Sequence, residues 1–128
     1  MSLPAKLRAA GLKFSEDDSN WLRGGFEMPD GRMQGFYLMK EPDDIFGHSE
    51  YDFLSVVGPS GNAADVKKAC EIAARSKRGA IIVDSDDTIC VRMEIPVNLD
   101  GPAALEHVKL CCFVADEMEK EIFGHDKF

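Results

Sequence analysis

Apolar and polar residues alternate with a period of two between Thr88 and Val97, the clearest strand pattern in the sequence. The apolar members are Ile89, Val91, Met93, Ile95 and Val97, while Arg92 and Glu94 face the other way. Such alternation is typical of a half-buried β-strand, and Pro96 places the strand's end there. Shorter runs predict strands at 51–57 and 80–83, the latter followed by an acidic turn at 84–87.

Two more strands are predicted on either side of Asp30-Gly31, because this dipeptide favours a tight hairpin turn. A two-residue turn pairs Met28 with Met33, Phe26 with Gly35 and Leu22 with Met39. The expected core face then carries Leu22, Phe26, Met28, Met33, Tyr37 and Met39. The opposite face carries Trp21, Arg23, Glu27, Gln34, Phe36, Leu38 and Lys40.

Three helices are predicted at about 3–11, 63–77 and 102–123. Pro4 suits the first turn of the first helix, Asn62 caps the second, and Asp100-Gly101-Pro102 starts the third. The second helix has an apolar stripe of Val66, Ala69, Cys70 and Ala73. The chain is therefore predicted to be one α+β domain over residues 1–128. It has an antiparallel five-stranded sheet and the order α-β-β-β-α-β-β-α, with an exposed loop at 41–50.

The last helix has more apolar residues than one buried face needs. Its broad core face is predicted to carry Leu105, Val108, Cys111, Cys112, Ala115, Met118 and Ile122. Leu110, Phe113 and Val114 point away from that face, among glutamates. Either the first helix or the C-terminal tail covers them, or they form a partner surface. Trp21, Phe36 and Leu38 on the outer sheet face favour the partner surface, because aromatic residues flanked by charges are typical interface anchors.

Composition and charge narrow the classes of partner. The 128 residues are 45% hydrophobic and 30% charged, an ordinary globular balance. With 15 basic and 23 acidic side chains the formal charge is −8, which argues against nucleic acid or an anionic membrane as partner. No apolar run is long enough to span a bilayer, and Met1-Ser2-Leu3-Pro4 has no secretory-signal pattern, so we expect a cytoplasmic protein.

No motif for catalysis, a cofactor or a metal meets its full pattern. The acidic turn at 84–87 resembles the start of a calcium loop, yet Ile89 and Ile95 stand where its glycine and glutamate belong. His107 and Cys111 lie one helical turn apart but lack further zinc ligands. The four cysteines, Cys70, Cys90, Cys111 and Cys112, are expected to be reduced core thiols. The segment 57–62 lacks phosphate-loop spacing.

The element order resembles the type III secretion chaperone-like fold, and in particular the YbjN family of bacterial proteins. The best stretch runs from Arg78 to Asp84, then from Thr88 to Val97, then into the long helix. The resemblance implies a small cytosolic binding protein, often dimeric, with chaperone-like or regulatory roles and no catalytic residues. The acidic 41–50 loop departs from that family.

Two functional hypotheses follow from the sequence. The first is a non-enzymatic protein-binding domain that forms a homodimer or binds another protein, without a cofactor. The alternative is a small-ligand-binding protein or an enzyme with a pocket under the 41–50 loop, near His48 and Tyr51, since loops often carry function. A closed pocket that joins His48 to a carboxylate or a cysteine would favour the alternative.

Overall fold

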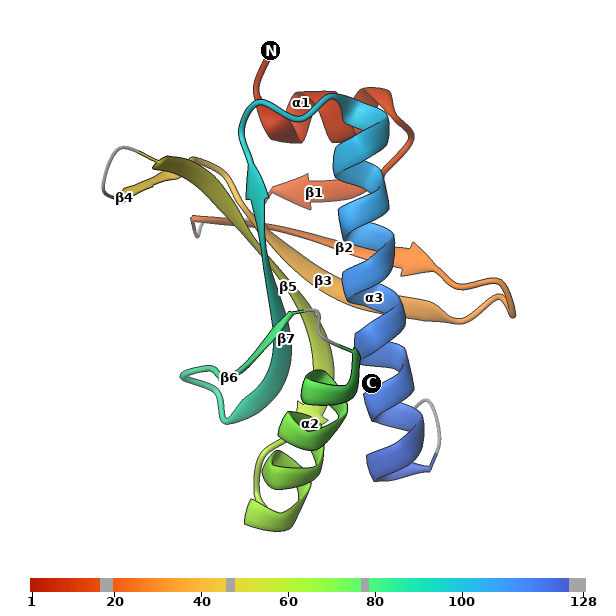
Figure 1. Ribbon diagram of the computed structural model, residues 1–128. Coiled ribbons are helices and arrows are strands. Elements are labelled where there is room, and N and C mark those ends of the chain that lie inside the picture. Colours follow the sequence, from red (N-terminus) through yellow and green to blue (C-terminus); the bar gives the residue numbers. More distant parts are fainter. Residues whose placement is uncertain (17–19, 46–47, 77–78, 125–128) are drawn as a thin grey trace.

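A twisted antiparallel sheet carries all three helices on one of its faces (Figure 1). The computed structural model describes residues 1–16, 20–45, 48–76 and 79–124, without the side chains of Ile45 and His48. The helices are α1 (Leu3–Ala9), α2 (Ala63–Ser76) and α3 (Gly101–Phe123). The strands are β1 (Phe14–Glu16), β2 (Trp21–Glu27), β3 (Met33–Met39), β4 (Asp43–Ile45), β5 (His48–Pro59), β6 (Ala80–Val83) and β7 (Thr88–Pro96). The sheet order is β1-β2-β3-β5-β7-β6, and β4 pairs with β5.

The predicted α+β class, with three helices and an antiparallel sheet, is confirmed. The five-strand order is wrong, because β1 and β4 add two short strands and give α-β-β-β-β-β-α-β-β-α. The predicted exposed loop at 41–50 is also wrong in part. Asp43 and Asp44 pair with Glu50 and Ser49, so that loop is largely a hairpin that lengthens β5.

The hairpin between β2 and β3 has a longer turn than predicted. Glu27 pairs with Met33 and Leu22 with Leu38, so residues 28–32 form a five-residue connection. Within it the Met28 N–H donates to the Arg32 carbonyl at 2.7 Å. Side chains alternate between the faces of a strand, so this one-residue shift turns every side chain of β3 to the opposite face. The predicted core face is right for β2 and wrong for β3.

The core lies between the sheet and α3, which runs across the inner face of β3, β5 and β7. Phe36, Leu38 and Phe53 from the sheet meet Cys111 and Ala115 from the helix in one buried cluster. Asp100 caps α3 by accepting the Ala103 N–H at 2.8 Å, and Gly124 ends it in a left-handed conformation. No helix in the described part of the chain is long and apolar enough to cross a bilayer.

Two glycines on the β2–β3 hairpin, one crowded by its neighbours and one not, give a matched pair of stability predictions. A Cβ at Gly24 would lie 2.6 Å from the Lys13 carbonyl oxygen and 2.5 Å from the Phe36 ring, whereas a Cβ at Gly35 meets only Val56 at 4.0 Å. Gly24→Ala should therefore lower the free energy of unfolding by about 1–3 kcal/mol through overpacking. Gly35→Ala should change it by less than about 0.5 kcal/mol. Urea denaturation of both variants measures the difference, and equal losses would contradict it.

Candidate functional site

Among the described residues, no helix lies over the face of the sheet opposite α3, which is here called the open face (Figure 1). One row of side chains crosses it in register, because each strand pairs residue by residue with the next. This row consists of Arg23, Tyr37, Leu54, Arg92 and Ala80, from β2, β3, β5, β7 and β6. The row mixes aromatic, aliphatic and cationic groups, so the open face is neither a dry core surface nor a fully solvated one.

The open face contains a hollow of about 390 Å³. Its walls are the side chains of Trp21, Tyr37, Leu54 and Ile82, together with Arg23, and the turn at 84–86 forms its rim. The guanidinium carbon of Arg23 lies 5.5 Å from the centre of the Tyr37 ring, which is a cation–π contact. The volume falls within the range of ligand-sized sites, and the lining combines flat apolar walls with charges of both signs. We call this feature the open-face hollow.

A second hollow of about 400 Å³ continues the first along the open face. The two share Arg23 and Tyr37, and the second extends over Gly35 and Val56 toward Ser15 in β1. Because Gly35 has no side chain, the surface is low at this point. The combined groove crosses several strands, a shape that suits an extended chain better than a compact molecule.

The acidic rim of the open-face hollow is a hairpin turn and not a calcium loop. The Asp84 Oδ1 atom accepts the backbone N–H groups of Asp86 and Thr88 at 2.9 and 3.0 Å. Asp87 adopts a left-handed conformation with φ of 56°, which closes the turn. Within the described residues no group of three His, Cys, Asp or Glu could hold a metal ion. Asp86 is exposed, and its carboxylate adds negative charge at the rim.

The predicted outer-face residues separate into one surface residue and two core residues. Trp21 is half-buried and lines the open-face hollow. Phe36 and Leu38 are 2% and 0% exposed, so their expected place on a partner surface is wrong. Phe36 instead stacks on Phe53 with ring centres 5.0 Å apart. The physical reason is the longer hairpin turn, which brings Tyr37 to the open face in their place.

The three outward residues predicted on α3 are exposed to different degrees. Phe113 is 42% exposed and packs edge-to-face against Phe26, with ring centres 6.4 Å apart. Leu110 and Val114 are half-buried, and Val114 packs against the core cluster. Phe113 and Phe26 therefore form a small apolar contact between α3 and β2.

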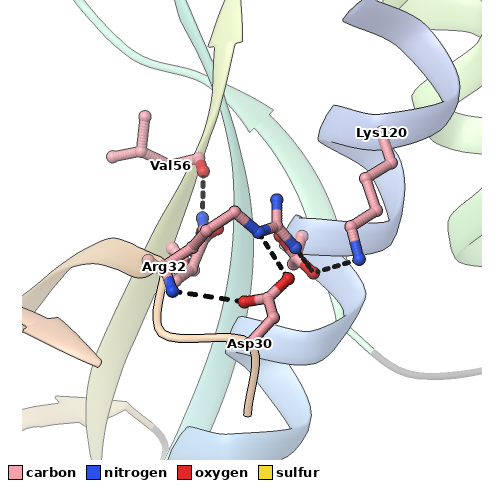
Figure 2. A network of polar contacts seen from close by, with 7 residues as sticks. Asp30, Arg32, Val56 and Lys120 are labelled. Carbon is pink, nitrogen blue, oxygen red and sulfur yellow. Dashed lines mark hydrogen bonds and ion pairs between the residues drawn. The ribbon is translucent and has the colours of Figure 1, made fainter. Parts of the chain in front are cut away.

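A polar network ties the β2–β3 hairpin to α3 (Figure 2). The Arg32 guanidinium contacts Asp30 at 2.7 Å and Asp116 at 2.9 Å, and the Lys120 ammonium contacts the same Asp116 oxygen at 3.2 Å. Beside it the buried Gln34 amide donates to the Val56 carbonyl. The hydrogen bond from Arg32 holds the pKa of Asp30 below its usual range. Sequence reasoning missed this network, because nothing local relates Arg32 to a helix residue 84 positions away.

The cysteines divide into three buried thiols and one exposed thiol. Cys90, Cys111 and Cys112 are fully buried, and burial raises the pKa of Cys90 and of Cys112 to about 12. All four cysteines are free, as expected, but Cys70 is exposed and its predicted place in the core is wrong. Ala69 and Ile72 are the buried residues of α2 instead.

The described polar side chains that the sequence suggested for a site, those of Cys111, His107 and Tyr51, do not line the open-face hollow. The Cys111 thiol donates to the Val91 carbonyl at 3.4 Å, and the His107 Nδ1 lies 3.0 Å from the Ala103 carbonyl oxygen. Tyr51 is buried in the core, where desolvation raises its pKa. The side chain of His48, and Lys77, Arg78 and His125 as a whole, fall outside the described residues.

Comparison with known proteins adds no relative: no family model matches this chain, and no curated protein does, so its likeness to the YbjN family stays a prediction.

Proposed function

We propose that this chain is a non-enzymatic protein-binding domain that forms a homodimer and receives a basic, extended segment of a partner protein on its open face. The observation that carries the proposal is the open-face hollow, with aromatic walls at Trp21 and Tyr37 and an acidic rim at Asp84 and Asp86. Aromatic side chains offer a large contact area at little cost in conformational entropy, and they are enriched among interface anchors.

Charge favours a basic partner segment over an acidic one. The formal charge of −8 gives the whole molecule a negative field, which speeds the approach of cations and slows that of anions. At the hollow itself, a lysine or arginine side chain can lie against the rings of Trp21 and Tyr37 with its cationic end near Asp86.

The chemistry of the lining supports binding and not turnover. Catalysis by acyl or phosphoryl transfer needs a nucleophile with a base within hydrogen-bond reach. The lining of the hollow has two hydroxyl groups, those of Ser85 and Tyr37, and it includes neither a histidine nor a cysteine. Asp84, the acid beside that serine, uses its Oδ1 atom to hold the turn. These groups suit recognition of a charged side chain.

Trp21 is the single tryptophan of the chain and lines the hollow, so its fluorescence reports occupancy. We expect a peptide of alternating valine and arginine to shift the Trp21 emission saturably, whereas the matching valine and glutamate peptide should not. Asp86→Lys should weaken binding of the arginine peptide by about fivefold, the size of one partly exposed charge contact. The control is Glu71→Lys, the same charge change at an exposed position on α2.

The Glu71→Lys control distinguishes a local contact at Asp86 from attraction by the net charge of the whole molecule. If Glu71→Lys weakens binding as much as Asp86→Lys does, the peptide is held by net charge alone and the hollow is not its site. Equal responses to the arginine and glutamate peptides would contradict the proposed charge preference. No response to either peptide at millimolar concentration would count against the binding function of this face.

A further inference from the structure

The edge strand β6 has none of the charged side chains that usually protect a sheet edge. Its four residues are Ala80, Ile81, Ile82 and Val83, and within the described part of the chain β6 pairs only with β7. Val83 is 44% exposed. Sheet edges are usually shielded by lysine, proline or bulges, because their free N–H and C=O groups pair readily with another strand. At the opposite edge, β1 exposes a serine and a glutamate.

The hydrogen-bond pattern identifies which backbone groups of β6 face outward. The Asp84 N–H donates to the Thr88 carbonyl at 3.0 Å, so this pair is hydrogen-bonded. Bonded and non-bonded pairs alternate in an antiparallel ladder, so Ile82 and Ala80 bond inward to β7. The Val97 N–H bonds to Ser49, which gives the same alternation on the far side of β7. Ile81 and Val83 therefore direct their N–H and C=O groups away from the sheet.

From this pattern we propose that two copies of the chain pair antiparallel through β6, around a twofold axis at Ile82. Hydrogen-bonded pairs need outward-facing residues on both strands, which places Ile81 of one copy opposite Val83 of the other. The pairing then forms four backbone hydrogen bonds, two at each of two equivalent positions. The two Ile82 side chains meet across the axis on the open face, where cross-strand apolar pairs stabilise a sheet.

The distribution of charge along β6 and its turn favours the antiparallel direction for the second copy. Parallel pairing would bring two acidic turns together, each with Asp84, Asp86 and Asp87, whereas antiparallel pairing places them at opposite ends. In the antiparallel register, Asp84 of one copy lies beside Ala80 of the other. Ala80 pairs with Arg92 on its other side, so the Arg92 cation, which contacts Glu94 and Asp52 in its own copy, lies only one strand away from that acidic turn.

The pairing deepens the proposed function, on whose homodimer it rests, by joining the two open faces into one surface. Ile82 lines the open-face hollow of its own copy, so the two hollows lie on either side of the axis. A partner segment that reaches both hollows binds as a bivalent ligand, which raises its affinity without any new contact. The pairing would explain why the apolar edge strand β6 lies next to the open-face hollow.

The test removes one outward N–H and leaves the ladder within the molecule intact. Proline at residue 83 loses the N–H that would donate to Ile81 of the other copy, whereas Val83→Thr keeps both the N–H and the β-branched shape. In sedimentation equilibrium at about 50 μM, wild type and Val83→Thr should have about twice the 14.1 kDa of one chain, and Val83→Pro should have 14.1 kDa. Val83→Lys, a charged edge that keeps the N–H, should shift the dissociation constant upward at least tenfold.

Circular dichroism of each variant establishes that it is folded, and Val83→Lys keeps the test decisive if the proline variant does not fold. A monomeric wild type at several hundred micromolar, or a folded Val83→Pro that dimerises as well as Val83→Thr, would overturn the pairing. Titration of folded monomer with the arginine peptide, followed by Trp21 emission, keeps the two proposals separate. Binding by the monomer leaves the peptide site valid without the dimer, and a wild-type dimer that ignores the peptide leaves the pairing valid without the peptide site.

Discussion

Truncation of Phe36 to alanine should lower the free energy of unfolding by about 3–5 kcal/mol, the usual cost of removing a fully buried aromatic ring. Phe36 is 2% exposed and stacks on Phe53 inside the core. The same change at Phe113 should lower it by about 1 kcal/mol, because that ring is 42% exposed and loses mainly its edge-to-face contact with Phe26. Guanidinium denaturation at pH 7 measures both values.

The pair of variants also tests the hairpin register. In the two-residue-turn register Phe36 would lie on the outer face, and its truncation would cost no more than that of Phe113. A loss below about 1.5 kcal/mol at Phe36 would therefore contradict the five-residue turn. Phe26→Ala should give a loss of stability between the other two, because Phe26 is half-buried, whereas Phe36 is buried and Phe113 is exposed.

The buried thiols should make the fold lose stability at alkaline pH. Burial raises the pKa of Cys90 and Cys112 from 9.0 to about 12, and raises that of Cys111 as well. A raised folded pKa contributes stability that is complete below pH 9 and is lost as pH rises toward 12, since the unfolded chain releases these protons first. One pH unit above 9 corresponds to about 1.4 kcal/mol per thiol, so Cys90 and Cys112 together should remove roughly 3 kcal/mol by pH 10, and Cys111 adds to that loss.

Matched cysteine variants separate this effect from the titration of tyrosine and lysine. Urea denaturation of wild type and Cys112→Ala between pH 8 and pH 10.5 should give stability curves that converge as pH rises. The difference in slope should be about 1 kcal/mol per unit. Cys70→Ala, at an exposed site, should run parallel to wild type. Parallel curves for Cys112→Ala would show that its thiol ionises equally in both states.

Periodicity predicted the elements that are long enough to complete a pattern. The alternation at 88–97 places Ile89, Val91 and Ile95 in the core, and the stripe of the last helix correctly buries Val108, Cys111 and Met118. Both patterns show which side of an element is buried, and the residues of that one element are enough to reveal it. The fold class and the number of helices could therefore be predicted from the sequence.

The register of the β2–β3 hairpin was not recoverable in the same way. Asp30-Gly31 marked the turn correctly, but its length depends on backbone contacts such as Gly31 N–H to the Met28 carbonyl, at 2.8 Å. Two and five residues suit the same local sequence, and each choice gives β3 a face with apolar residues. The error placed Phe36 and Leu38 on the surface and Tyr37 in the core, so two of the three sheet residues predicted for the partner surface are buried, while the fold class was right.

Short strands and long-range polar contacts also escape local patterns. The strands β1 and β4 have three residues each, too few to establish a period, and each forms only because a longer strand lies beside it. The contact between Arg32 and Asp116 joins residues far apart in sequence, and only the assembled sheet and helix bring them within 2.9 Å.

The position of α3 has a consequence for the order in which the molecule can form during synthesis. The helix that covers the inner face of the sheet also contacts α1, and the Lys6 ammonium bonds to the Val97 and Leu99 carbonyls at 3.2 and 2.9 Å. A ribosome-bound chain that has not yet released residues 101–123 therefore exposes Phe36, Phe53 and Val91 to water. Such a nascent chain offers chaperones a hydrophobic sheet surface until its final helix emerges.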